Sequence, residues 1–480
     1  MIYPRVRIFR HYISRASIFL VAAEGAILLL LAHVLLATQT NAQGQGIVPD
    51  SWFASFIAFV CIVIFLSLGL YNRTVIPNIQ VMMVRYVFGL FVVSIVTYGL
   101  LQAHLSSVPV ELYSPTKYYL LPTAIMLGMA ALFCTRLLFL YVADLGVLRQ
   151  RIVIIGPREL VDSFQRAVVG DQASGFEIVA VMDPAAVEDS VTAELRRETE
   201  RAPIIPFVTE RADMSAVLDQ FDADELVIAL PDSDLLPTDA LLDCKLRGIQ
   251  VTEFLSFVER EMGRVDLQHL DPKWLIFSDG FGAGVFVNAT QRCLDVAISI
   301  IILLFAWPIL LLVTILIRLE GKRGALNYQA HTGRNGEPFA LIKFRSAAAV
   351  PEAGGAPRWA RADDDQISGM GNFIQKTRID EIPQIINVLR GEMSIVGPRP
   401  ERPFFVASLS HHIPHYNERH RVRPGITGWA QINYPFGASI EDAREKLAYD
   451  LYYVKNRSLF LNIIIILQTV RAVLWPTGGH

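Results

Sequence analysis

Long apolar stretches dominate the first third of the chain. Four of them cover residues 16–37, 52–71, 86–101 and 118–141, and each is close to the roughly 20 residues that span a bilayer. The first run is long for a signal peptide, and no small-residue cleavage site precedes the second. The pattern therefore predicts four transmembrane helices within a membrane region of residues 1–145.

Basic residues orient this membrane region. Four arginines precede the first apolar run, whereas residues 39–50 contain no Lys or Arg. Cytoplasmic loops carry an excess of positive charge, so we expect the N-terminus in the cytoplasm. Four crossings would return the chain to the same side.

A fifth apolar run, residues 294–319, has a different character. Arg292 flanks it on one side, Arg318 and Lys322 flank it on the other, and Pro308 lies near its middle. Proline removes a backbone donor and kinks a helix, and both flanks read as cytoplasmic. We expect a helix, a break and a second helix that enter and leave one leaflet. A fifth full span with a tolerated proline is the alternative.

Between residues 146 and 260, short β-rich apolar runs alternate with helical stretches. The runs are residues 152–155, 178–182, 204–208, 226–230 and 249–254. This alternation predicts a parallel α/β sheet. Gly156 after the first strand and Asp183 after the second suggest a dinucleotide fold, but the turn after Gly156 lacks the further glycines that let a backbone approach a pyrophosphate. We therefore expect a structural or regulatory Rossmann-like module.

Composition narrows the class of protein. Of the 480 residues, 52% are hydrophobic and 19% are charged, which excludes a purely cytosolic or a disordered chain. The net charge of −3 provides no field for gripping nucleic acid, so nucleic acid is not expected as a partner. The four cysteines are far apart and signal neither a metal cluster nor a disulfide framework, which fits a reducing compartment.

Two adjacent carboxylates, Asp380 and Glu381, stand out in the last third of the chain. Pro383 suits the first turn of a helix, and apolar residues follow it at helical spacing. Taken alone, the pair reads as a helix cap: Asp380 would satisfy free amides and Glu381 would complement the helix dipole.

The surrounding basic residues favour chemistry instead. Lys343, Arg345 and Arg378 precede or adjoin the carboxylates, and Arg399 follows between two prolines. Paired carboxylates among cations indicate phosphate plus a metal ion: a carboxylate can attack phosphorus, Mg²⁺ can shield the repulsion between anions, and Arg offers a fork for phosphoryl oxygens. For any single basic residue, a solvated surface charge remains the alternative.

Several spaced motifs carry a family resemblance. They are Arg292-Cys-Leu-Asp295, Lys343-Phe-Arg345, Arg378-Ile-Asp-Glu-Ile-Pro-Gln384, Gly397-Pro-Arg-Pro400 and Arg423-Pro-Gly-Ile-Thr-Gly-Trp-Ala-Gln-Ile-Asn433. The block from residue 291 to 475 closely resembles the bacterial sugar transferase family, the monotopic phosphoglycosyl transferases. Four spans and a Rossmann-like module resemble its long subclass, and residues 8–15 look most like the exopolysaccharide transferases that accompany exosortase systems.

The resemblance implies an organisation and a fold class. Residues 261–290 would be a linker, and residues 291–480 a re-entrant helix with a small, mostly helical catalytic domain. The fold class is then membrane α plus α/β, with four transmembrane helices ahead of the Rossmann-like parallel module. The protein would be a multi-pass protein of the bacterial cytoplasmic (inner) membrane, with its catalytic domain on the cytoplasmic face. A homodimer is left open.

The resemblance also implies a reaction. Sugar-1-phosphate would pass from a UDP-sugar to undecaprenyl (polyprenyl) phosphate, with release of UMP, as the first step of exopolysaccharide synthesis. Asp380 would be the nucleophile, would form a covalent phosphosugar intermediate and would lie against Mg²⁺, with Glu381 as its partner. The residues expected to bind substrate phosphates are Arg399, Arg378, Lys343 and Arg345.

The membrane part of the resemblance assigns three further residues. Arg292 and Asp295 would anchor the re-entrant helix at the interface, and Pro308 would form its kink. A re-entrant helix makes chemical sense because the site must meet a cytosolic sugar nucleotide and a lipid phosphate at one surface.

Some positions depart from the family pattern, and other functions compete. His331 stands where the family usually has an arginine.

Two other functions are alternatives to this reaction. One is a plain glycosyltransferase that releases UDP, and another is a non-catalytic membrane scaffold. The apolar run from residue 459 to 475 fits either a helix on the membrane face or a helix packed in the core.

Overall fold

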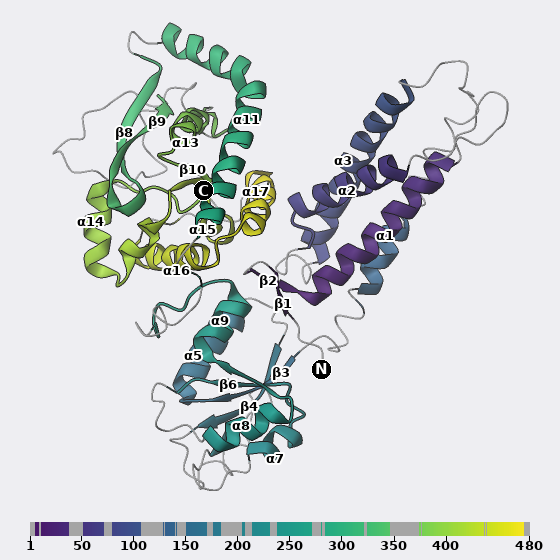
Figure 1. Ribbon diagram of the computed structural model, residues 1–480, viewed down its shortest axis with the longest axis vertical. Helices are drawn as coiled ribbons and strands as arrows, with labels where there is room; N and C mark the ends of the chain where they lie inside the picture. The colour runs from purple at the N-terminus through teal and green to yellow at the C-terminus, as the bar shows by residue number, and fades with distance from the viewer. Residues whose placement is uncertain are drawn as a thin grey trace. The chain divides into compact units, whose positions relative to one another are not determined.

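The structure is a computed structural model that divides into two compact units (Figure 1). It describes residues 5–8, 11–37, 51–71, 79–106, 128, 130–139, 141, 150–169, 176–183, 204–206, 214–230, 238–270, 280, 284–320, 324–345, 374–375, 377–435, 437 and 439–474. Unit 1 comprises Met1–Ile8 and Tyr12–Glu261, and unit 2 comprises Phe9–His11 and Met262–His480.

The elements of unit 1 begin with a short β-hairpin and the apolar helices. These are β1 (Arg5–Ile8), β2 (His11–Ser14), α1 (Arg15–Ala37), α2 (Ser51–Ser67), α3 (Ile79–Ser106) and a shorter helix, Ala130–Phe139. The α/β part follows with β3 (Gln150–Ile155), α5 (Arg158–Val169), β4 (Phe176–Asp183), β5 (Ile204–Pro206), α7 (Met214–Gln220), β6 (Glu225–Ile228), α8 (Thr238–Leu246), β7 (Gln250–Glu253) and α9 (Phe254–Met262).

Two of the four expected spans are long and apolar enough to cross a membrane over their described residues. Their apolar windows are Ser17–Val34 in α1 and Gln80–Leu100 in α3. The second expected span forms α2, which has 17 residues. The fourth is described mainly over Ala130–Phe139, and the rest of that run lies outside the described residues. Membrane-like helices are therefore present, and the count of four stays a prediction.

A buried ion pair links the apolar helices of unit 1. Arg136 donates from Nε to Glu24 Oε1 at 2.7 Å and from Nη1 to the carbonyl of Leu70 at 2.8 Å. The hydroxyl of Tyr71 donates to Glu24 Oε2 at 2.5 Å. Charged groups in apolar helices are stabilised by such mutual pairing, so this cluster joins α1 to the Ala130–Phe139 helix.

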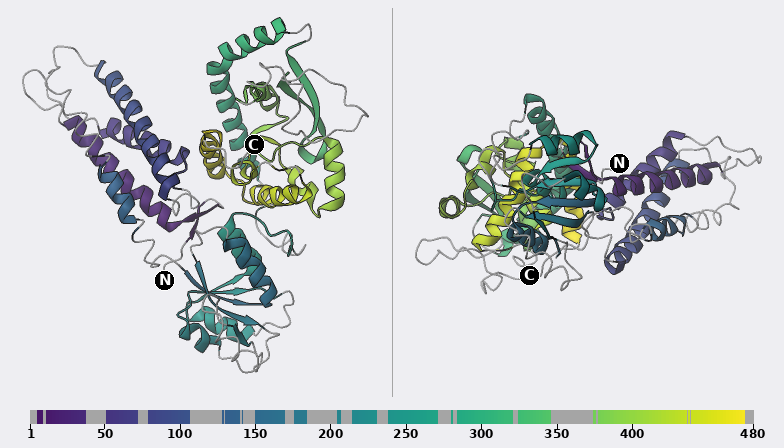
Figure 2. Two further views of the ribbon diagram at one scale, coloured as in Figure 1. Left: turned by 180° about the vertical axis from the view of Figure 1, so that it is seen from behind. Right: turned by 90° about the horizontal axis from the view of Figure 1, so that it is seen from below.

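The sheet of unit 1 has five parallel strands in the order β5-β4-β3-β6-β7. The prediction of a parallel α/β sheet is confirmed, and the order is that of a doubly wound fold. Helices cover both faces (Figures 1 and 2). Met214 and Leu218 of α7 and Cys244 of α8 join one core cluster with the strands, whereas Phe164 of α5 packs against Phe257 of α9 on the other face.

Two contacts of this chain lie near the position where such a fold binds nucleotides. A Cβ added at Gly156 would lie 2.7 Å from the Cβ of Ala229, across the point where the strand order reverses. The carboxylate of Asp183 accepts a hydrogen bond from the backbone N–H of Arg158 at 3.0 Å, at the start of α5. A bound phosphate would need that position. The geometry therefore favours the structural or regulatory interpretation.

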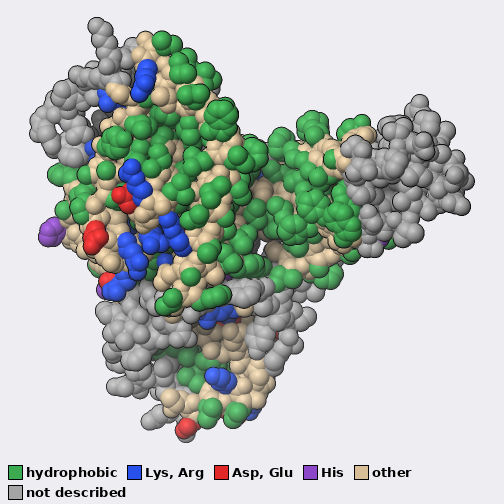
Figure 3. All heavy atoms as spheres, turned by 45° about the horizontal axis from the view of Figure 1, so that its top comes forward, with side chains coloured by type: hydrophobic (Ala, Val, Ile, Leu, Met, Phe, Trp, Pro, Cys, Tyr) green, Lys and Arg blue, Asp and Glu red, His purple; other side chains and the backbone are tan. Residues whose placement is uncertain are grey.

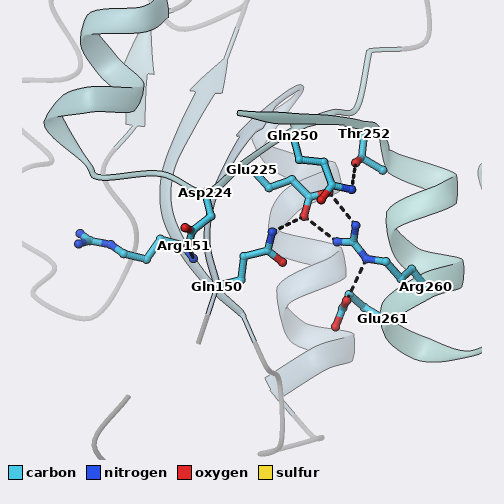
Figure 4. A network of polar contacts seen from close by, with 8 residues as sticks. All are labelled: Gln150, Arg151, Asp224, Glu225, Gln250, Thr252, Arg260 and Glu261. Carbon is cyan, nitrogen blue, oxygen red and sulfur yellow. Dashed lines mark hydrogen bonds and ion pairs between the residues drawn. The ribbon is translucent and has the colours of Figure 1, made fainter. Parts of the chain in front are cut away.

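A second polar cluster lies at the opposite, amino end of the strands (Figure 4). Arg260 of α9 donates to both carboxylate oxygens of Glu225, at 2.9 and 2.6 Å, and from Nε to Glu261 at 3.1 Å. Gln150 donates to the same Glu225 at 2.8 Å. The charges of Arg260 and Glu225 are thus paired within the interior, so this network fastens α9 to the sheet.

The elements of unit 2 are mostly helices with short strands between them. They are α11 (Val285–Glu320), β8 (Leu326–Thr332), η4 (Arg334–Gly336), β9 (Pro338–Phe344), η5 (Ile379–Gln384), α13 (Ile385–Arg390), β10 (Ser394–Val396), α14 (Pro403–His412), η6 (Tyr416–Arg421), β11 (Gly425–Thr427), α15 (Trp429–Asn433), α16 (Ile440–Asn456) and α17 (Leu459–Leu474), where η marks a 3₁₀ helix.

The fifth apolar run forms α11, a single helix of 36 residues. The expected break at Pro308 is wrong: the helix continues through the proline. Figure 1 shows α11 turning sharply part-way along its length, and such a bend lets a helix tolerate a proline without ending there. At 1.5 Å per residue the helix is about 54 Å long, well beyond the roughly 30 Å of a bilayer core.

Helix α17 answers the question left open for the C-terminal apolar run. Leu461, Ile465 and Arg471 are buried, and Arg471 donates to the carbonyl of Ile432 in α15 at 2.9 Å. Val473, by contrast, is 61% exposed. One face of α17 is therefore packed into the core of unit 2, while the other stays apolar and uncovered.

Candidate active site

The two carboxylates lie in η5, one short helix before α13. Arg378, in a left-handed backbone conformation, occupies the position that precedes η5, and no side chain caps this helix. Asp380 and Glu381 are thus in its first turn without being its cap. The expected cap at Asp380 is wrong, whereas both carboxylates do lie in the first turn, where negative charge complements a helix dipole.

Asn387 places Lys343 next to the carboxylates. This fully buried residue of α13 accepts from the backbone N–H of Ile342 at 3.0 Å and donates to the carbonyl of Ala340 at 2.8 Å. Its side-chain amide therefore forms the two backbone hydrogen bonds with β9 that a neighbouring strand would form. Because η5 leads directly into α13, this bonding sets Lys343 of β9 beside Asp380 and Glu381, whose charges act on it.

The turn that carries Arg399 rests on close backbone packing. Strands β10 and β11 pair in parallel, and a Cβ at Gly425 would overlap the backbone nitrogen of Gly397. The backbone N–H of Gly397 donates to the carbonyl of Thr427 at 2.9 Å. Only glycine allows this approach, which brings the Gly397-Pro-Arg-Pro400 turn back to the carboxylates. There, Nη2 of Arg399 donates to Glu381 Oε1 at 3.0 Å.

The pKa values of the two carboxylates differ because their surroundings differ. Burial and the neighbouring charge of Glu381 raise the pKa of Asp380 to about 6. Burial also acts on Glu381, but the charges of Arg399 and Lys343 outweigh it and hold the pKa of Glu381 below its usual range. Both groups are ionised at neutral pH. Asp380 has the more basic oxygens, and Glu381 has its charge engaged by Arg399, so Asp380 is the better placed nucleophile.

A cavity of about 220 Å³ opens beside these residues. Lys343, Gln384 and Arg399 line it near the carboxylates, while Phe405 and Leu409 of α14 contribute apolar walls elsewhere. Figure 3 shows Lys and Arg side chains gathered on one face of this unit, next to a broad hydrophobic surface. The cavity combines cations with apolar walls, as a site for an anionic molecule with an apolar part would.

The remaining phosphate-binding candidates have different surroundings. Arg378 is exposed and adjoins the carboxylates, where its charge helps to lower the pKa of Glu381. Arg345 follows β9, donates its backbone N–H to Ala325 at 2.9 Å and is absent from the cavity lining. The charges of Lys343, Arg378 and Arg399 all act on Glu381, whereas Arg345 is not among these residues.

Arg292 and Asp295 fasten α11 to this unit through protein contacts. Arg292 donates to the carbonyls of Val388 and Leu389, at 2.5 and 2.6 Å, and so closes the end of α13. Asp295 is 1% exposed and accepts from the hydroxyl of Ser394 and the backbone N–H of Ile395. Both residues therefore link α11 directly to the elements of the site, and their anchoring at the membrane interface stays a prediction.

The carboxylates suit a magnesium ion in their chemistry. Mg²⁺ is held in proteins by one or two carboxylates together with substrate phosphates and water. Two adjacent carboxylates beside phosphate-binding cations match that set, and Asp380 is the one that Arg399 leaves unengaged. No larger cluster of His, Cys, Asp and Glu occurs among the described residues.

Sequence reasoning missed Arg419, which lines the cavity, and its partner Asp450. Arg419 and Asp450 form a buried ion pair at 2.8 Å, and Arg419 also bonds the backbone of Arg399. Arg419 lies in a run rich in charged residues, which resembles any solvated surface. His331, noticed only as a departure, is buried against the carbonyl of Pro400 at 3.1 Å.

Comparisons with known proteins bear on unit 2 above all. The bacterial sugar transferase family matches residues 286–476. A UDP-N-acetylgalactosamine-undecaprenyl-phosphate N-acetylgalactosaminephosphotransferase of Aeromonas hydrophila is 36% identical over 273 residues, 56% of this chain and 63% of that protein. A UDP-glucose:undecaprenyl-phosphate glucose-1-phosphate transferase of Xanthomonas campestris pv. campestris is 37% identical over 182 residues, 38% of each chain.

A second glucose-1-phosphate transferase is matched over most of its length. This UDP-glucose:undecaprenyl-phosphate glucose-1-phosphate transferase of Caulobacter vibrioides is 38% identical over 199 residues, 41% of this chain and 74% of that protein. The chain covers less than two thirds of the Aeromonas and Xanthomonas proteins. The extent of the Caulobacter match and the family motifs of the site together show that this chain belongs to the bacterial sugar transferase family.

Proposed function

We propose that the protein is a phosphoglycosyl transferase that moves sugar-1-phosphate from a UDP-sugar to undecaprenyl phosphate and releases UMP. The observation that carries the proposal is the asymmetric pair of carboxylates, in which Arg399 binds Glu381 at 3.0 Å while burial raises the pKa of Asp380 to about 6. Its matched relatives bear names for this type of reaction.

The reaction proceeds in two displacements at one phosphorus atom. A carboxylate oxygen of Asp380 attacks the phosphorus that bears the sugar, the bond to the bridging oxygen breaks, and UMP leaves with that electron pair. The product is an acyl phosphate between Asp380 and the sugar phosphate. A phosphate oxygen of the polyprenyl phosphate then attacks the same phosphorus and releases the carboxylate.

The cations of the site balance the charge of the donor. Arg399 and Lys343 line the cavity next to the carboxylates, where they can pair with the diphosphate oxygens. Arg378 lies at the exposed edge of the site. Mg²⁺, held at Asp380 with the donor, would supply charge neutralisation between the carboxylates and the diphosphate.

The long helix α11 suits a site at a membrane surface. It is too long for one straight span, carries Pro308 and bends, and its exposed side chains include Leu304, Phe305 and Trp307. We propose that α11 enters and leaves the cytoplasmic leaflet, which would place the site at the surface where a water-soluble donor meets a lipid phosphate. The lipid-linked sugar would then begin an exopolysaccharide.

The released nucleotide tests this function directly. Full-length protein in nanodiscs with Mg²⁺, polyprenyl phosphate and a panel of UDP-sugars should release UMP. Without acceptor, the intact protein mass should increase by one sugar phosphate. Asp380→Asn should abolish both signals, while Glu441→Gln, an exposed carboxylate on α16, should leave them unchanged.

Other outcomes would assign a different function. Release of UDP would identify a plain glycosyltransferase and remove the nucleophilic role of Asp380. Release of neither nucleotide from any donor would support the scaffold.

A further inference from the structure

Four consecutive backbone carbonyls, from Pro398 to Glu401, accept hydrogen bonds around Arg399. The carbonyl of Pro398 accepts from the N–H of Gly425 at 2.9 Å, and that of Glu401 from the N–H of Thr332 at 2.8 Å. The carbonyl of Pro400 accepts from Nδ1 of His331 at 3.1 Å, and that of Arg399 itself from Nη2 of Arg419 at 2.9 Å. Four donors from separate segments thus hold four consecutive carbonyls.

Arg419 is the only charged donor among these four. It lies in η6 and is 5% exposed, and its guanidinium has three partners. Besides the Arg399 carbonyl, it donates from Nη1 to the hydroxyl of Tyr416 at 2.7 Å and pairs with Asp450 of α16 at 2.8 Å. Asp450 is 1% exposed. The guanidinium is therefore fixed by Tyr416 and Asp450 and bonds the turn, and Arg419 lines the same cavity as Arg399.

A buried ion pair is weak evidence for stability, because removing two charges from water offsets much of their attraction. Its position suggests another role. The carbonyl that Arg419 holds belongs to the residue whose side chain binds Glu381. Any rotation of the Arg399 backbone would move that guanidinium, and small displacements of a charged group at a reacting centre reduce rates strongly.

We propose that Arg419 is a positioning residue which, paired with Asp450, holds the backbone of Arg399 and thereby aims its guanidinium at Glu381 and at the donor phosphates. The inference rests on the proposed function for the nature of the donor. The arrangement requires a planar fork, because one ammonium group cannot bond the Arg399 carbonyl, Tyr416 and Asp450 in the same geometry.

A double-mutant cycle separates this role from general support of the fold. The variants are Arg419→Lys, Arg399→Ala and the two combined, in the full-length protein in nanodiscs. Arg471→Lys is the matched control, because Arg471 is also buried and donates to a backbone carbonyl in this unit. UMP release gives kcat/KM for the donor, and UDP titration gives Kd without turnover.

Arg419→Lys should lower kcat/KM by about tenfold or more, while Arg471→Lys should stay within about twofold. In the Arg399→Ala background, Arg419→Lys should cause almost no further loss, because the group it positions is gone. The same non-additivity should appear in the Kd for UDP. Losses that multiply in the double variant would overturn the proposal, whether Arg419 touches substrate itself or only supports the fold.

A substitute variant and a second readout allow the experiment to decide the role of Arg419 in two difficult cases. If Arg419→Lys fails to fold, Tyr416→Phe removes one partner of the guanidinium and serves in the same cycle. If the wild-type protein releases no UMP, the proposed function fails, while the cycle in Kd still decides the role of Arg419.

Discussion

At the scale of single residues, the site depends on small differences between like groups. Asp380 and Glu381 are neighbours in sequence, yet Arg399 bonds only one of them. That contact, together with Lys343, keeps Glu381 charged and leaves Asp380 with the raised pKa. Two similar side chains thereby differ in chemistry: Asp380 has the more basic carboxylate, and Glu381 is a fixed anion.

This difference predicts an acid limb in the activity. Only ionised Asp380 can attack phosphorus, so kcat/KM should fall as the pH decreases through about 6, the pKa of Asp380. Glu381, whose pKa is lowered, stays charged over this range. The measurement is kcat/KM for the donor between pH 5 and pH 8, a window of about one unit or more on each side of that pKa.

Asp450 supplies the control for this profile. Burial raises its pKa to about 6 as well, against the opposing charge of Arg419. Asp450→Asn removes this second titration, so any acid limb that remains belongs to the active site. A flat profile in Asp450→Asn would show that the limb of the wild type came from Asp450 and would contradict the role given to Asp380.

At the scale of elements, the sequence patterns predicted the segments that consist mainly of apolar residues, because such segments are buried wherever they lie in the fold. The five strands of the sheet are short apolar runs, and all five form near the expected residues. The apolar helices are recognisable for the same reason. The long helix α11 differs from expectation at Pro308, because the cost of one missing hydrogen bond is local and a bend absorbs it.

The candidate site was only partly predictable. Asp380, Glu381 and Arg399 belong to recognisable motifs, and the structure brings them together. Arg419 and Asp450 are 31 residues apart in sequence and meet only through packing of η6 against α16, which no local pattern encodes. The helix around the carboxylates likewise differs from expectation: it is a 3₁₀ helix and not the start of an α-helix, because Pro383 suits both.

The close contact between β10 and β11 predicts that one methyl group added at Gly425 strongly lowers the stability of the protein. In Gly425→Ala, the new Cβ would overlap the backbone of Gly397, which cannot move without displacing the Arg399 turn. The unfolding temperature of the full-length protein should fall by about 6 °C or more, with loss of UMP release.

Gly324→Ala is the matched control for this substitution. Nothing lies within 4 Å of a Cβ at Gly324, so this variant should unfold near the wild-type temperature. Wild-type stability in Gly425→Ala would mean that the two strands can separate without cost.

At the scale of the whole molecule, the placement of unit 2 relative to the membrane decides whether the proposed chemistry is accessible. The expected topology puts the N-terminus and both ends of α11 on the cytoplasmic side. A full span by α11 would instead place the end of the helix, and all that follows it, outside. The two topologies differ at an exposed position just after the helix, Gly324.

Cysteine labelling tests the topology. In a variant lacking the four natural cysteines, Gly324→Cys should resist a membrane-impermeant maleimide in intact spheroplasts and react after permeabilisation. Gln43→Cys, in the segment without Lys or Arg that follows the first span, should react in intact cells. Labelling of Gly324→Cys from outside would show that α11 crosses the membrane.

The packing of α17 has a consequence for biosynthesis. Thr469 of α17 bonds Thr427 of β11 at 2.7 Å, and Tyr453 of α16 donates to the carbonyl of Val396 at 3.0 Å. Strands β10 and β11 therefore lack part of their support until the ribosome has made residues far beyond them. Helix α11 would already be in the lipid by then, with Asp295 awaiting the backbone that satisfies it. The candidate site would thus be assembled only after α11 has inserted into the membrane.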